Sequence, residues 1–271
     1  MIHSFLETLV PVESDDDDDD SPDVEFAFSI KASAPAGAGT AVTPEQCVAL
    51  VVCGPGAAAA YASCALPLAP MPWALEVVKE TLVRTFPPPP KSPRFFVGRG
   101  GSGVGEAPVV VAVLDSAVPG DMAAAWAEAL LSAFPAAMEV VMLDRIFRAG
   151  WRTSCGQERP QEPHLCGLWT AAYGASGPLD RADVLALLPA PNAVEGLAAA
   201  LLSRCEASRR RGLVALGLQD GAHLGEGTLS AFEKLGPLLR RLGLLQEGGK
   251  VPDYREAIRQ NVPSVSMSIY A

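Results

Sequence analysis

The stretch Gly212–Leu218, which reads GLVALGL, is one of four short apolar runs that decide the fold. The other three are Cys47–Cys53 (CVALVVC), Val109–Leu114 (VVVAVL) and Met138–Leu143 (MEVVML, interrupted only by Glu139). Each run is short and bounded by turn-forming residues, which is typical of strands that are buried on both faces. The four runs therefore predict a central, largely parallel sheet.

Helical patterns follow most of these strands. The Ala-rich segment Ala57–Leu66 follows the first run, and Asp121 can cap a helix that extends to Phe134. In this second helix Met122, Trp126 and Leu130 recur every four residues on one face. The alternation of strands and helices predicts a single layered α/β/α domain with helices covering the central sheet.

The second half of the chain contains the clearest helical pattern, Asn192–Cys205. Asn192 and Glu195 stand three residues apart, as in a capping box, and apolar residues recur at helical spacing up to Cys205. Thr228 is expected to cap a further helix, which Pro237 would end or kink. A short last helix is expected to begin at Asp253.

Several segments do not fit the strand–helix alternation. Residues 1–22 lack the apolar content to fold, and the run Asp15–Asp20 repels itself, so a disordered acidic leader is expected. The α/β domain is expected over residues 23–260, with a first strand at Val24–Ile30. Within it, residues 86–108 are Pro- and then Gly-rich and residues 148–163 are polar, which predicts two mobile surface insertions.

The formal net charge of −10 lies entirely near the N-terminus. The first 25 residues hold ten acidic residues and no Lys or Arg, so the other 246 residues carry 21 acids and 21 bases. A neutral body argues against nucleic-acid binding, which needs a concentrated positive surface. A scaffold whose acidic leader recruits a basic partner remains one interpretation of this asymmetry.

The composition also bears on compartment and metals. The N-terminal residues have no basic segment, so neither a signal peptide nor a transit peptide is expected, and Gly and Pro residues interrupt the uncharged stretch Cys47–Leu75, so no membrane span is expected. The six cysteines form no CxxC pair, which favours free thiols in the cytoplasm or nucleus. His164 and Cys166 lie near Cys155 in the sequence but lack a fourth ligand, which argues against zinc.

Three aspartates support an alternative function. Asp115, Asp144 and Asp220 each follow or end a predicted strand, at the sheet edge where α/β proteins bind ligands. They could serve a metal- or nucleotide-dependent enzyme, although aspartate is also common where a strand turns. The glycines of Gly98–Gly103 fit G-x-G-x-x-G but precede a strand, so a flexible loop is favoured over a dinucleotide site. No catalytic residue and no cofactor are assigned.

The C-terminal tail, residues 261–271, is the candidate contact site. It carries no charge before the terminal carboxylate, and Val265, Met267 and Ile269 alternate with serines in an extended pattern. The ending Ile269-Tyr270-Ala271 suits insertion into a partner's pocket, where the ring gives apolar contact and the phenol a hydrogen bond. A final edge strand on the domain itself, or a frayed end, fits the same pattern equally well.

Several blocks of the chain, in order, resemble the proteasome assembly chaperone 1 family. The segment Leu187–Cys205 looks like the L-x-x-PN-hydrophobic helix of that family, and the following GLVALGLQD…TLSAFEKLGPLL and the closing Ser268–Ala271 are similar to it. More weakly, VALVVCGPGAAAAYASCAL and VVVAVLDSAV…WAEALLSAF resemble its earlier strand–helix units. The similarity thus extends in segments over about residues 45–271, and the insertion at 86–108 departs from it.

The resemblance implies a non-catalytic α/β chaperone. Such a protein would pair with proteasome assembly chaperone 2 and sit on the outer face of the proteasome α-ring. The family's C-terminal hydrophobe–Tyr–any residue motif maps onto Ile269, Tyr270 and Ala271, and in family members such tails enter pockets between adjacent α-subunits. The heterodimer would thereby support α-ring formation and block premature activator docking or off-pathway ring association.

Overall fold

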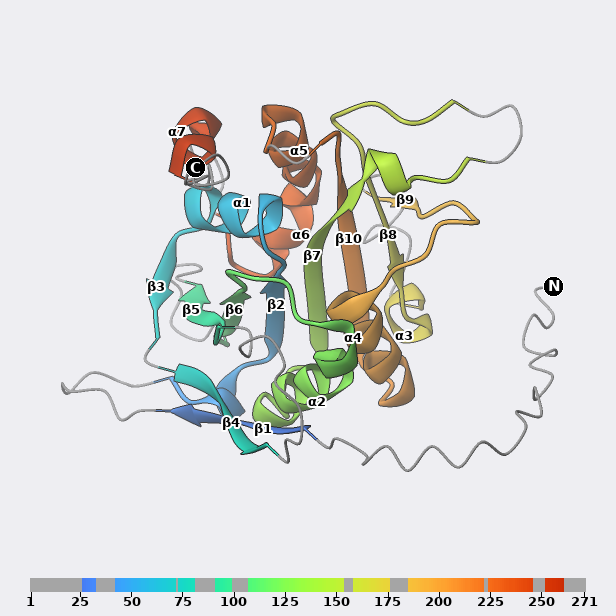
Figure 1. Cartoon of the computed structure of the whole chain (residues 1–271). Coiled ribbons are helices and arrows are strands. Elements are labelled where there is room, and N and C mark those ends of the chain that lie inside the picture. Colours follow the sequence, from blue (N-terminus) through green and yellow to red (C-terminus); the bar gives the residue numbers. More distant parts are fainter. Residues whose placement is uncertain are drawn as a thin grey trace, which may run out of the picture.

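An eight-stranded mixed sheet forms the middle layer of the computed structural model, and helices cover both of its faces (Figure 1). The expected α/β/α architecture with a central sheet is confirmed. The structure describes residues 26–32, 42–71, 73–80, 91–98, 107–153, 158–175, 185–221, 224–245 and 252–260.

The four predicted apolar runs form the parallel centre of the sheet. The strands are β6 (Val109–Val113), β2 (Ala49–Cys53), β7 (Glu139–Phe147) and β10 (Arg211–Gln219), in that spatial order. β2 pairs in parallel with β6 and β7, and β7 pairs in parallel with β10 over nine residues of each strand. These parallel strands define two edges: an amino edge where they begin and a carboxyl edge where they end.

Antiparallel strands flank this parallel centre. β5 (Arg94–Gly98) and β3 (Leu68–Pro70) extend the sheet beyond β6, and β8 (Leu165–Trp169) pairs antiparallel with β10. The two-residue β9 (Ala186–Leu187) lies parallel to β8 at the far edge. β5 falls inside the segment 86–108 that the sequence pattern assigned to a surface insertion, because its apolar residues stand between a proline run and a glycine run.

A separate two-stranded antiparallel ribbon consists of β1 (Phe26–Ala32) and β4 (Trp73–Glu80). β1 begins two residues after the expected start of the first strand, and the preceding residues lie outside the described part of the chain. This ribbon lies against α2 (Ala123–Ala133), as Figure 1 shows. Trp73 contacts Phe134 just after that helix, with ring centroids 5.6 Å apart.

The helices are divided between the two faces. α2 and α4 (Gly196–Ala207) cover one face, and α1 (Ala57–Ala65), α5 (Glu226–Ala231), α6 (Gly236–Arg241) and α7 (Tyr254–Gln260) cover the other. The short α3 (Ala171–Gly174) follows β8. Single 3₁₀ turns occupy Pro44–Gln46, Gly120–Met122, Arg148–Gly150 and Phe232–Leu235.

Two helix starts differ from the sequence-based predictions. Asn192 does not cap α4: its side-chain amide bonds the backbone N–H and carbonyl of Arg152, at 2.8 and 2.9 Å, and the helix begins at Gly196. Thr228 does not cap α5 either, because the helix begins at Glu226 and the buried Thr228 hydroxyl donates to Glu162 at 2.7 Å. In both cases the side chain that the local pattern assigned to a cap forms hydrogen bonds with a distant segment of the chain instead.

Two other helix starts are closer to expectation. Asp121 lies in a 3₁₀ turn, and α2 proper starts two residues later at Ala123. Asp253 precedes α7, and its carboxylate accepts a hydrogen bond from the Arg255 backbone at 3.0 Å, as a cap would. Pro237 lies in the first turn of α6. The preceding 3₁₀ segment ends at Leu235, just before the proline, where the sequence predicted an end or a kink.

The core has two apolar layers, one on each face of the sheet. Successive residues of a strand point to opposite faces, so Leu50 and Val52 pack under α2 and α4 while Val51 and Cys53 pack under α1 and its neighbours. This double burial explains why the central strands are continuously apolar. Among the described residues, no helix has both the length and the apolar character that crossing a bilayer requires.

Candidate functional site

The carboxyl edge of the sheet holds the three aspartates that the sequence singled out, but each one has its own separate partner. The guanidinium of Arg94 donates two hydrogen bonds to Asp115, at 2.8 and 3.2 Å. Arg148 donates to Asp220 at 3.2 Å. Both of these carboxylates are therefore held in surface ion pairs with arginines from distant parts of the chain.

Asp144 has a different environment. Its carboxylate accepts a hydrogen bond from the Arg145 backbone at 2.8 Å and lies so close to Gly54 that a Cβ there would approach Oδ1 to 2.5 Å. Burial raises the pKa of Asp144, and the hydrogen bond and charge of Arg145 oppose this shift. Within the described ranges no group of three or more His, Cys, Asp or Glu side chains could hold a metal ion.

The residues considered for zinc also have other roles. Cys166 is buried in β8, where its thiol faces the Leu216 carbonyl at 3.9 Å, and burial raises its pKa to about 12. The ring of His164 packs edge-on against Trp151, with centroids 5.6 Å apart. Cys155 lies outside the described residues, as does most of the Gly98–Gly103 motif, whose first glycine ends β5.

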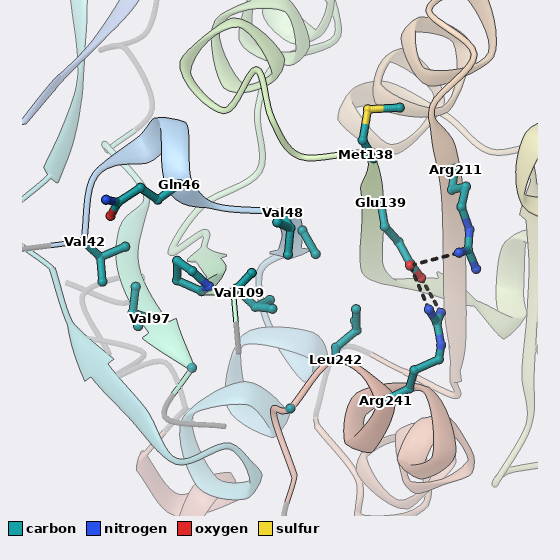
Figure 2. A pocket seen from close by; sticks show the side chains of 15 residues that line it. Val42, Gln46, Val48, Val97, Val109, Met138, Glu139, Arg211, Arg241 and Leu242 are labelled. Atoms are coloured by element: carbon teal, nitrogen blue, oxygen red, sulfur yellow. Dashed lines mark hydrogen bonds and ion pairs between the residues drawn. The ribbon is translucent and has the colours of Figure 1, made fainter. Parts of the chain in front are cut away.

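A groove lies at the opposite, amino edge of the sheet. It has a volume of about 930 Å³ and is lined by the first residues of the parallel strands and by the end of α6. We call it the amino-edge groove; its side chains are shown in Figure 2. The residues that line it are Val42, Gln46, Val48, Ala49, Val97, Gly98, Ala107, Pro108, Val109, Met138, Glu139, Arg211, Arg241, Leu242 and Gly243.

The apolar part of this groove exposes side chains that a core would normally cover. Val48 is 42% exposed and Met138 is 59% exposed, directly before β2 and β7. Both residues belong to runs that the sequence predicted to be buried strands. They are exposed because the chain enters each strand one residue after them, at the rim of the sheet rather than under a helix.

The polar end of the groove is an ion-pair network around Glu139. This buried carboxylate accepts hydrogen bonds from both terminal nitrogens of Arg241, one at 2.9 Å, and lies 3.7 Å from Arg211 (Figure 2). The guanidinium of Arg211 also stands over the ring of Tyr173, 5.3 Å from its centroid. Two cations on one carboxylate join β7, β10, α6 and α3 at this edge.

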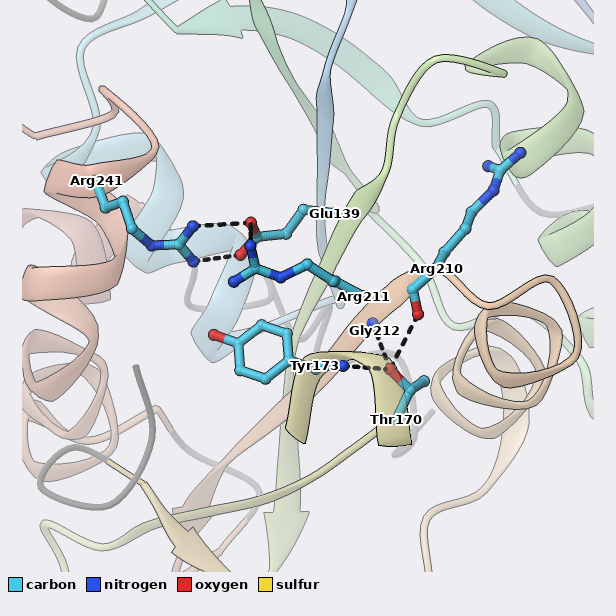
Figure 3. A network of polar contacts seen from close by, with 7 residues as sticks. All are labelled: Glu139, Thr170, Tyr173, Arg210, Arg211, Gly212 and Arg241. Atoms are coloured by element: carbon cyan, nitrogen blue, oxygen red, sulfur yellow. Dashed lines mark hydrogen bonds and ion pairs between the residues drawn. The ribbon is translucent and has the colours of Figure 1, made fainter. Parts of the chain in front are cut away.

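Thr170 fixes the start of β10 beside this network, as Figure 3 shows. Its hydroxyl donates to the Arg210 carbonyl at 3.0 Å and accepts from the backbone of Gly212 and Tyr173, at 2.9 and 3.2 Å. Arg211 consequently points toward Glu139, whereas the side chain of Arg210 extends to the other side of the chain. No sequence motif marks this groove, because its lining comes from segments spread over two hundred residues.

The predicted contact residues Ile269, Tyr270 and Ala271 lie outside the described residues, so their use as a contact site stays a prediction.

The comparisons with known proteins bear on the whole fold. No protein-family model matches the sequence, and no curated protein matches it. Among solved structures, PbaB of Pyrococcus furiosus, an archaeal proteasome activator, aligns with a TM-score of 0.55 at 14% identity, over 87% of this chain and 94% of PbaB. A Thermoplasma acidophilum protein of unknown function aligns with a TM-score of 0.50 at 14% identity, over 80% of this chain and 85% of that one.

The chain has the fold of PbaB. A second Pyrococcus furiosus protein, PbaA, described as an archaeal homologue of proteasome-assembly chaperone, aligns with a TM-score of 0.49 at 14% identity, over 86% of this chain and 87% of that one. At 14% identity the similarity is one of fold, that is, of the arrangement of strands and helices. The PbaB-like fold places the amino-edge groove and the carboxyl-edge aspartates at opposite ends of the parallel strands.

Proposed function

We propose that this chain is a proteasome assembly chaperone. The observation that supports this function most is the PbaB-like fold, which aligns over nearly the whole of both chains, PbaB itself being a proteasome activator. The sequence blocks that resemble proteasome assembly chaperone 1 fall on elements of this fold: the PN-hydrophobic helix is α4, and the following blocks form β10 and α5 to α6.

The proposal includes a partner and a target. The chain acts as a heterodimer with proteasome assembly chaperone 2 on the α-ring of the core particle, in the cytoplasm or nucleus, promoting assembly and blocking premature activator docking. Its tail inserts Ile269 and Tyr270 into a pocket between α-subunits, and the carboxylate of Ala271 meets a buried lysine there. An uncharged tail suits this role because apolar insertion involves no desolvation of charged side chains.

The enzyme alternative has less support from the described residues. A site that binds a metal or a nucleotide phosphate needs several polar groups that converge on one point. Asp115, Asp144 and Asp220 instead have separate partners: Asp115 and Asp220 each accept from an arginine guanidinium, and Asp144 accepts from a backbone N–H. A ligand-induced thermal shift with Mg²⁺ and ATP that disappears when all three are changed to Ala would favour the enzyme over the chaperone.

The proposed function can be tested by affinity purification of the tagged full chain from cell lysate, followed by mass spectrometry. We expect α-type proteasome subunits and one homologous partner. Deletion of Tyr270 and Ala271 should reduce recovery of the α-subunits and leave the partner bound, whereas the matched change Ser266→Ala should preserve both. Unchanged recovery of α-subunits after the deletion would remove the tail from the mechanism, and their absence from the wild-type sample would contradict the proposed function.

A further inference from the structure

The turn between α4 and β10 presents three consecutive arginines, Arg209–Arg211. α4 ends at Ala207, and the backbone of Arg210 then donates to the Cys205 carbonyl at 2.8 Å. Arg209 adopts a left-handed conformation, with φ of 56°, at the position where a helix end usually has glycine. The turn thereby holds an arginine at a strained position and exposes its side chain.

Much of the positive charge at this turn is not neutralised by acidic partners. Arg210 donates to the carbonyl oxygens of Leu131, Phe134 and Pro135, at 3.2 to 3.5 Å, and these groups carry no formal charge. Among the described residues, Arg204 pairs with Glu128 and Arg211 pairs with Glu139, whereas Arg209 and Arg210 have no acidic partner. The body of the protein is neutral overall, so this unpaired positive charge is local.

A cleft lies beside the turn, and Arg210 is one of the residues that line it. It lies between the ends of α2 and α4, has a volume of about 330 Å³, and is lined by Glu128, Leu131, Ser132, Pro135, Arg204, Ala207, Ser208 and Arg210. We call it the α2–α4 cleft. Arg204 and Glu128 form an exposed ion pair across it at 3.2 Å, and such pairs exchange partners at little cost.

The acidic leader joins the fold at β1, which packs against a helix that lines this cleft. The described chain begins at Phe26 in β1, and β1 packs against α2, the helix that forms one wall of the cleft. Asp20 stands six residues before Phe26, which an extended chain covers in about 20 Å, and α2 itself is only about 16 Å long. The six residues from Asp20 to Phe26 are therefore long enough to run the length of α2, whose last turn lines the cleft.

We propose that the acidic leader of this chain docks, through Asp15–Asp20, on the α4–β10 turn and the adjoining α2–α4 cleft. Ten acids precede the fold, and the turn holds two arginines, Arg209 and Arg210, that have no acidic partner among the described residues. The docked leader shields Arg209 and Arg210 from other polyanions, so it acts as a built-in competitor at the one basic surface described above. This inference is independent of the proposed function, because it involves no proteasome subunit.

The test uses the full chain in which Asp15–Asp20 are all changed to Asn, so that its own leader no longer competes. A fluorescent synthetic peptide of residues 11–25 is titrated against it and followed by anisotropy. Two substitutions are compared in this background: Arg209→Gly, which also relieves the left-handed backbone, and the matched Arg159→Gly at an exposed arginine outside the turn.

We expect the peptide to bind the six-Asn chain more tightly than the wild type, whose own leader occupies the turn. Arg209→Gly should weaken this binding about threefold and Arg209→Glu more, while Arg159→Gly leaves it unchanged. Raising salt from about 0.02 M to about 0.3 M should abolish binding, because the Debye length falls to several ångströms. Equal binding by the wild type and the six-Asn chain, or equal effects of Arg209→Gly and Arg159→Gly, would overturn the proposal.

Discussion

Glu139, the first residue of β7, and Arg241, the last residue of α6, are joined by a two-pronged ion pair at the amino edge of the sheet. Glu139 is 7% exposed, so its carboxylate depends on its partners for the hydrogen bonds that water would otherwise supply. This pair ties the helical layer to the sheet at the same end as the exposed groove.

Removal of the charge of Arg241 should therefore destabilise the fold. We expect Arg241→Gln to lower the free energy of unfolding by about 2 kcal/mol, less than for a fully buried pair because Arg211 remains near the carboxylate. Urea denaturation followed by circular dichroism measures the change, with Arg240→Gln on the exposed side of α6 as the control. Equal midpoints for the two variants would show that Glu139 does not depend on Arg241.

Gly167 in β8 packs against the backbone of β10. A Cβ at this position would lie 2.0 Å from the Val214 carbonyl oxygen and 2.8 Å from the Leu185 side chain. Since the first of these is backbone in the middle of a sheet, we expect Gly167→Ala to cost about 3 kcal/mol of stability. Gly221→Ala, in a turn where an added Cβ would meet no atom within 4 Å, should be close to neutral. Thermal denaturation of the two variants makes the comparison.

Asp144 should make stability depend on pH in a defined direction. Burial raises the pKa of its carboxyl group above the ordinary value of 3.8, so the folded state binds the proton more tightly than the unfolded state. This contribution is greatest at low pH and is lost as the pH rises from 3.8 through the folded pKa. Asp144→Asn keeps the acceptor for the Arg145 backbone N–H. As the pH rises, its free energy of unfolding should therefore increase relative to that of the wild type. Denaturant midpoints of both proteins between about pH 4 and about pH 7 would show it, and parallel curves would contradict it.

Thiol reactivity should separate Cys64 from the other described cysteines. Burial raises the pKa of Cys47, Cys53 and Cys166 to about 12 and that of Cys205 to about 11, and all four are buried. Cys64, near the end of α1, is only partly buried. We expect iodoacetamide to modify Cys64 first among these five, as peptide mapping by mass spectrometry would report. Equally fast modification of Cys53 would mean that α1 opens readily from the sheet.

The central strands were predictable because burial on two faces requires an unbroken apolar run, and such runs are visible in a single sequence. β5 was not, although Phe95 is fully buried, because five strand residues between prolines and glycines resemble a loop. The failed caps have a common cause as well. Asn192 and Thr228 bond residues 40 and 66 positions away, and no local pattern reports such partners.

The candidate sites show the same limit. The sequence located Asp115 and Asp220 correctly at the carboxyl edge, but Arg94 and Arg148, which bind them, precede them by 21 and 72 residues. The amino-edge groove had a weaker signal still. Met138 and Val48 belong to apolar runs, and only the three-dimensional start of each strand exposes them.

The outermost strands of the sheet have a further consequence for how this protein meets others. β3 has three residues and includes Pro70, and β9 has only two, followed closely by Pro189 and Pro191. Such short, proline-marked rims offer another chain almost no run of backbone N–H and C=O groups to extend the sheet. In the described part of the molecule, association by strand addition is thus discouraged at both of these rims. Recognition there rests on side chains, and substitutions can change the fit of a side chain to one partner at a time.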